Sequence, residues 1–126
     1  MTQGSTDNRR KFSRIRFQCA AELVLGVERV SVEVIDVSLN GALLQVPEGF
    51  VGRRGQPCSL YIRLEPSESY IRMIGEMAHV EAGSVGVRRE EIDLESMAHL
   101  RRLVELNLGD PALLDRELDA LIAERL

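Results

Sequence analysis

Residues 20–38, AAELVLGVERVSVEVIDVS, contain the pattern that decides the fold. Short β-branched runs lie on both sides of positions 26–28, which predicts two strands joined by a tight turn. Every second residue from Val30 to Val34 is valine, so one face of the second strand is apolar until Asp36 interrupts it. This alternation is typical of a strand with one face on a hydrophobic core.

Four similar runs follow and extend the pattern to residue 92. They are GALLQV (41–46), PCSLYIRL (57–64), YIRMIGEMAHVEA (70–82) and SVGVRREEI (84–92). Glycine and proline separate them, and Gly75 inside the third of these runs indicates a bulge or a bend. Six short strands with small turns predict a mainly β fold, a six-stranded antiparallel (split) β-barrel over about residues 16–92.

The hydrophobic period changes after the sixth run. Apolar residues recur at helical spacing over about 95–108, and Asp93 or Glu95 suits the first turn. Asp110-Pro111 predicts a second helix over about 111–125. We expect the first helix to cover one end of the barrel, and the second to pack on the body or to contact another chain, giving a monomer or a weak dimer. The chain is then a single domain over 9–126, preceded by a disordered segment, 1–8.

Several classes of protein are excluded by what the sequence lacks. No run approaches the roughly 18–20 apolar residues of a membrane-spanning helix, and MTQGSTDNRRKF has no apolar core of a secretion signal. We therefore expect a cytoplasmic protein with no membrane insertion. Cys19 and Cys58 predict two buried thiols, and with His79 and His99 as the only histidines there is little to ligate a metal. Without a GxSxG, HExxH or P-loop motif, we expect no catalytic residues and no enzyme.

Charge is distributed unevenly along the chain. The net charge is −4, but residues 1–17 carry +4 and the others carry −8, and 15 of the 16 basic residues are arginine. An acidic body argues against nucleic-acid binding, which needs a broad basic face. An oligonucleotide-binding barrel is an alternative, but five aromatic residues offer little surface on which bases can stack.

The basic segment contains RxxxR, formed by Arg10 and Arg14, with Arg9 directly before it. Such a segment can be a solvated tail or a polybasic patch for lipid or nucleic acid. Arginine favours a more specific role, because its planar guanidinium binds a phosphate through two hydrogen bonds and also binds the O6/N7 edge of guanine.

A second motif, DxSxxG, is formed by Asp36, Ser38 and Gly41 between two predicted strands. It can simply be a tight turn, in which the side chains bond nearby amides and glycine adopts a conformation closed to other residues. The same geometry also suits a ligand, because Asp36 can accept hydrogen bonds from guanine, Ser38 adds a hydroxyl and Gly41 allows close approach.

These two motifs, in this order and followed by a small barrel, resemble the PilZ domain family. The family signature is RxxxR followed about 20–30 residues later by (D/N)xSxxG, and here Arg14 and Asp36 are 22 positions apart. SVGVRREEID is similar to the closing strand of the family, and HLRRLVELNLGD is similar to a helix of small stand-alone members. The resemblance covers most of residues 9–108.

The resemblance implies a receptor for cyclic di-GMP, a ligand with two phosphates and two guanines. It assigns phosphate and guanine edges to Arg10 and Arg14, and guanine recognition to Asp36 and Ser38, with Gly41 shaping the turn. An arginine directly before the motif, as at Arg9, resembles the pattern of family members that bind an intercalated ligand dimer. The expected stoichiometry is therefore one ligand or two ligands per chain. Related members often have tryptophan where this chain has His79, which either stacks on a guanine or is an ordinary strand residue.

The function that follows is a second-messenger receptor with a mobile N-terminal arm, residues 1–16. The arm becomes ordered on the ligand, and this change relays the signal to a protein partner. The alternative is a PilZ-type adaptor that binds a protein and not the nucleotide. The intact arginine and aspartate motifs favour the receptor.

Overall fold

The computed structural model describes residues 15–64 and 69–108. These residues form six strands and one helix, in the order β1 (Ile15–Leu25), β2 (Glu28–Ser38), β3 (Gly41–Gln45), β4 (Pro57–Arg63), β5 (Tyr70–Glu81), β6 (Ser84–Ile92) and α1 (Leu94–Leu108). The segment 1–8, predicted to be disordered, and the predicted helix over 111–125 lie outside the described residues. No helix within the described ranges is long and apolar enough to cross a membrane.

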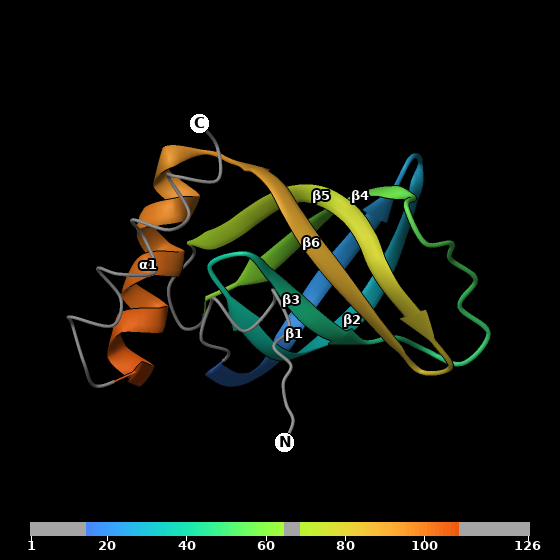
Figure 1. Ribbon diagram of the computed structural model, residues 1–126, viewed down its shortest axis with the longest axis horizontal. Helices are drawn as coiled ribbons and strands as arrows, with labels where there is room; N and C mark the ends of the chain where they lie inside the picture. The colour runs from blue at the N-terminus through green and yellow to red at the C-terminus, as the bar shows by residue number, and fades with distance from the viewer. Residues whose placement is uncertain (1–14, 65–68, 109–126) are drawn as a thin grey trace, which may run out of the picture.

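The six strands close into an antiparallel barrel, which confirms the predicted fold class. Their order around the barrel is β1-β2-β3-β6-β5-β4, and β4 returns to pair with β1 (Figure 1). The hairpin of β1 and β2 has a two-residue loop that begins at Gly26, whose φ is +63°. A glycine with positive φ at the first loop position matches the right-handed twist of the flanking strands.

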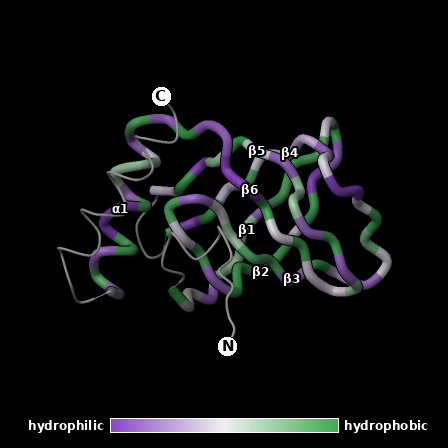
Figure 2. The backbone as a smooth tube through the Cα atoms, in the orientation of Figure 1, coloured by the Kyte–Doolittle hydropathy of each residue, from purple (hydrophilic) through white to green (hydrophobic). Residues whose placement is uncertain are grey.

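The core fills the inside of the barrel because each strand directs every second side chain inward. The largest fully buried side chains come from strands β1 to β5, together with Leu39 of the β2–β3 turn and Leu100 of α1. Those of the strands are Leu23, Val34, Val37, Leu44, Leu60, Ile62, Ile71, Met73 and Met77. Figure 2 shows the resulting alternation of hydrophobic and hydrophilic residues along the backbone.

Helix α1 covers one end of the barrel, as predicted (Figure 1). Its Leu100 and Val104 are fully buried in the same core as the strands. Asp93 caps the helix: its carboxylate Oδ2 accepts a hydrogen bond from the Ser96 amide at 2.9 Å, and its carbonyl accepts one from the Met97 amide at 2.9 Å. Of the two predicted N-terminal residues, Asp93 is therefore the cap, and Glu95 lies inside the first turn.

Candidate ligand-binding site

The DxSxxG motif lies at the turn between β2 and β3. Ser38 and Gly41 are opposite each other at the end of this hairpin, and Gly41 is also opposite Arg88 on β6. The turn is thus held between its own hairpin and a strand almost fifty residues further along the chain. A turn fixed on two sides can present its polar groups in a constant geometry.

Ser38 and Arg89 fix the shape of the turn. The hydroxyl oxygen of Ser38 accepts a hydrogen bond from the Asn40 amide at 3.2 Å, as predicted for a serine in this motif. From β6, the backbone amide of Arg89 donates to the Asn40 carbonyl, and the Arg89 Nε donates to the Leu39 carbonyl, both at 2.8 Å. Arg89 is only 4% exposed, because Val85, Val87 and Arg89 occupy the inward positions of β6. Arg89 is therefore a buried partner of the turn and not a solvated charge.

Gly41 is required for a different reason from the predicted one. Positive φ among the described residues occurs only at Gly26, Gly49, Gly55 and Gly83, so Gly41 does not have a conformation closed to other residues. A Cβ on Gly41 would instead lie 2.0 Å from the carbonyl oxygen of Val87. The glycine is therefore needed for the close approach of β3 to β6.

Asp36 lies where the regular alternation of β2 breaks. The pairing of β2 with β3 shifts between Val34 and Asp36, so Ile35 is an extra residue in the ladder. Val37 is fully buried as a result, and Asp36 is half-buried with its Oδ1 buried. Asp36 does not line the pocket described next.

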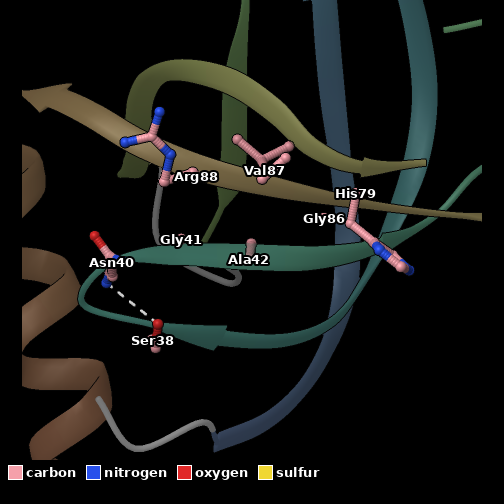
Figure 3. A pocket seen from close by; sticks show the side chains of 9 residues that line it. Ser38, Asn40, Gly41, Ala42, His79, Gly86, Val87 and Arg88 are labelled. Carbon is pink, nitrogen blue, oxygen red and sulfur yellow. Dashed lines mark hydrogen bonds between the residues drawn. The ribbon is translucent and has the colours of Figure 1, made fainter. Parts of the chain in front are cut away.

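A pocket lies on the barrel surface beside the turn (Figure 3). It is lined by the following residues of β2, β3, β5, β6 and the turn: Ser38, Asn40, Gly41, Ala42, Ala78, His79, Gly86, Val87 and Arg88. Its volume is about 140 Å³. Sites that enclose a drug-sized ligand occupy roughly 300–1,000 Å³, so these residues alone would bury only part of such a ligand.

The predicted site residues divide into three groups. Ser38, Gly41 and His79 meet in the pocket, Asp36 lies outside its lining, and Arg9, Arg10 and Arg14 lie outside the described residues. The register of β1 shows where the segment with these arginines joins the barrel, because Ile15 is opposite Val37. The chain therefore enters the barrel beside the turn.

His79 lies at the end of the pocket away from the turn (Figure 3). It follows a second irregularity, because the pairing of β5 with β6 shifts between Met77 and His79 and leaves Ala78 as an extra residue. The side chain is half-exposed, and its Nε2 lies 3.1 Å from Oε2 of Glu81. A bulge commonly redirects a side chain at a functional site, and here it leaves the imidazole accessible from the pocket.

Arg88 was not predicted as a site residue, although it lines the pocket beside the turn. Its Nη2 contacts Oε2 of Glu76 on β5 and lies 3.5 Å from Oε2 of Glu90. The sequence alone could not place it beside the turn, because the pairing of β3 with β6 joins segments that are far apart in the chain. Gly86, which is opposite His79 in the β5–β6 hairpin, also lines the pocket and was not predicted.

The two cysteines have no reactive character. Cys58 is buried and Cys19 is half-buried, and neither forms a disulfide. Burial raises the pKa of each thiol to about 11; the nearby carboxylate of Glu33 adds to the effect at Cys19, and those of Glu76 and Glu90 add to it at Cys58. A thiol with such a pKa is almost entirely protonated at neutral pH and is a poor nucleophile. The described part of the chain contains no group of three His, Cys, Asp or Glu residues that could hold a metal ion.

Known proteins share this fold. The structure of the Bacillus subtilis inhibitor of motility (MotI/DgrA) superposes with a TM-score of 0.65 and 18% identity over 79% of this chain, which spans about half, 53%, of that protein. The PilZ domain of CeSA from a cellulose-synthesizing bacterium superposes with a TM-score of 0.59 and 15% identity, covering 77% of this chain and 96% of that domain. At these identities the likeness establishes the fold. The sequence profile of the PilZ domain matches residues 8–106, and the chain therefore belongs to the PilZ domain family.

Proposed function

We propose that this chain is a cyclic di-GMP receptor that binds the dinucleotide between the basic segment, with Arg9, Arg10 and Arg14, and the pocket at the turn 38–41. Membership of the PilZ family supports this, because PilZ domains are nucleotide-binding and adaptor domains. The observation that carries the proposal is the register of β1, since Ile15 is opposite Val37, the residue directly before Ser38 of the pocket.

Chain length makes the proposed arrangement possible. Arg14 directly precedes Ile15, and an extended chain spans at most about 3.3–3.6 Å per residue. Arg10 is five positions from Ile15, so an extended segment can place it up to about 17 Å from the start of β1. A pocket of about 140 Å³ would hold only part of a dinucleotide, and the arm would supply the rest of the enclosure.

The proposed chemistry divides the ligand between the two parts. The guanidinium groups of Arg10 and Arg14 bind phosphate and guanine edges, and Arg9 adds a third guanidinium that suits an intercalated ligand dimer. The Ser38 hydroxyl and the Asp36 carboxylate bind guanine, and His79 offers a ring for stacking. Charge-assisted hydrogen bonds contribute about 1.5–3 kcal/mol each, so three or four of them, less the cost of ordering the arm, give micromolar or tighter binding.

Ligand binding would also produce the signal. The phosphates neutralise the arginines, and the arm becomes ordered across the mouth of the barrel. A protein partner would then distinguish the covered surface from the open one.

Titration calorimetry tests this proposal directly. We expect saturable heat when cyclic di-GMP is added to the wild-type chain, and loss of binding in Arg10→Ala, Arg14→Ala and Asp36→Ala. Arg29→Ala is the matched control, because Arg29 forms an exposed ion pair with Glu22 and does not line the pocket. Absence of heat with the wild-type chain would refute the proposal and favour an adaptor that binds only protein.

A further inference from the structure

We propose that Arg88 is an anion-binding side chain of this pocket, and that Glu76 and Glu90 neutralise it while the pocket is empty. The two carboxylates then lower the affinity for a phosphate-bearing ligand. This inference rests on the proposed function and adds to it a residue that attracts the ligand and a residue that opposes it.

The position of Arg88 makes it accessible to a ligand. It is directly opposite Gly41 in the β3–β6 pair and opposite Glu76 in the β5–β6 pair. Its side chain is 50% exposed, and Figure 3 shows it beside the turn, away from His79. Among the described residues that line the pocket, it is the only arginine or lysine.

The charges around Arg88 are unbalanced. Its Nη2 contacts Oε2 of Glu76, and Oε2 of Glu90 lies 3.5 Å from the same nitrogen. One guanidinium is therefore shared by two carboxylates, and this cluster carries a net charge of −1. A phosphate that approaches the cation also approaches two like charges, which repel it.

A change of partner at Arg88 is physically easy. The guanidinium has five N–H donors, so it can bind a phosphate along one edge while the other still faces a carboxylate. Ion pairs between solvent-exposed side chains are weak, because water competes for both charges. Glu76 is opposite Arg88 in the β5–β6 pair and its side chain is 27% exposed, so its carboxylate stays beside the guanidinium and continues to oppose the phosphate.

The ordinary alternative is that Glu76 and Arg88 form a cross-strand pair that only stabilises the sheet. In that case both Arg88→Ala and Glu76→Gln change the free energy of unfolding, and neither changes the affinity for cyclic di-GMP. The proposal instead predicts opposite effects on affinity from the two halves of one ion pair.

The test measures cyclic di-GMP affinity by calorimetry for wild type, Glu76→Gln and Arg88→Ala. We expect Glu76→Gln to bind about threefold to tenfold more tightly, because one like charge near the phosphate is removed. We expect Arg88→Ala to bind about tenfold more weakly, because a charge-assisted hydrogen bond is lost. The gain in Glu76→Gln should shrink at about 1 M salt, where the Debye length is about 3 Å.

The pair Glu22 and Arg29 provides matched controls. It is an exposed Arg–Glu pair with an N–O distance of 3.1 Å that lies outside the pocket. Glu22→Gln changes the net charge as Glu76→Gln does, and Arg29→Ala changes it as Arg88→Ala does. Both controls should bind as the wild-type chain does, and urea unfolding of every variant confirms that it is folded.

The inference is overturned if Arg88→Ala binds like wild type, or if Glu76→Gln binds no more tightly than Glu22→Gln. If the wild-type chain binds cyclic di-GMP and either of these results is found, only this inference fails, and the proposed function still stands. A wild-type chain that gives no heat refutes the proposed function, and this inference with it.

Discussion

The absence of a side chain at Gly41 allows β3 to lie against β6. A methyl group there would meet the Val87 carbonyl oxygen at 2.0 Å and its carbon at 3.1 Å. Both are backbone atoms, which cannot move aside as a flexible side chain does. The DxSxxG motif singles out this glycine, but a single sequence does not show which strand passes beside it.

We therefore expect Gly41→Ala to lower the free energy of unfolding by about 3 kcal/mol or more, because the two strands must separate. Gly26→Ala is the matched control. Gly26 has a φ of +63° with nothing within 4 Å of an added Cβ, so its substitution should cost only about 1–2 kcal/mol of backbone strain. Urea unfolding measures both. Equal losses in the two variants would contradict the steric role of Gly41.

Helix α1 illustrates how far the elements follow from local sequence. Its start was predicted from an acidic residue before an apolar stripe, and Asp93 forms that cap. Strands β2 to β6 likewise begin and end within a residue or two of the predicted runs, because the turn residues between them restrict the backbone locally, whereas β1 begins at Ile15, five residues before the run that starts at residue 20. The register shift at Gly75 was predicted from the glycine, but the extra residues Ile35 and Ala78 were not, since a bulge without a glycine depends on the partner strand.

The Asp93 cap predicts a pH-dependent contribution to stability. Hydrogen bonds from the backbone and side chain of Ser96 lower the pKa of Asp93 below its ordinary value of 3.8. The carboxylate is thus favoured in the folded state, and its contribution is fully present above the ordinary pKa. It is lost as the pH falls through the lowered pKa.

Asp93→Ala should therefore be less stable than wild type at neutral pH, and the difference should narrow in strong acid. Urea unfolding of both proteins at a series of pH values measures this difference in the free energy of unfolding. Glu105→Ala, an exposed position on the same helix, should show no comparable narrowing. A difference for Asp93→Ala that stays constant down to strong acid would contradict the role of the ionised cap.

At the scale of the whole molecule, the uneven charge combines with the closed barrel to define the site. The basic segment precedes β1, and β1 begins beside the DxSxxG turn although the two motifs are 22 positions apart. Ser38, Gly41 and His79 were predicted as site residues and meet in one pocket, and Arg88, which was not among the predicted site residues, lines the same pocket. Arg88 reaches the pocket only through the pairing of β3 with β6, and long-range register cannot be derived from periodicity in one chain.

The most direct test of the central claim is an amide NMR titration of the full chain with cyclic di-GMP. We predict saturable shift changes at residues 38–41, at His79 and at residues 86–88, together with those of Arg10 and Arg14. Glu22, Arg29 and Tyr61 lie on β1, β2 and β4, outside the pocket, and their signals should stay in place. Shift changes confined to these residues, or no changes at all, would contradict the account.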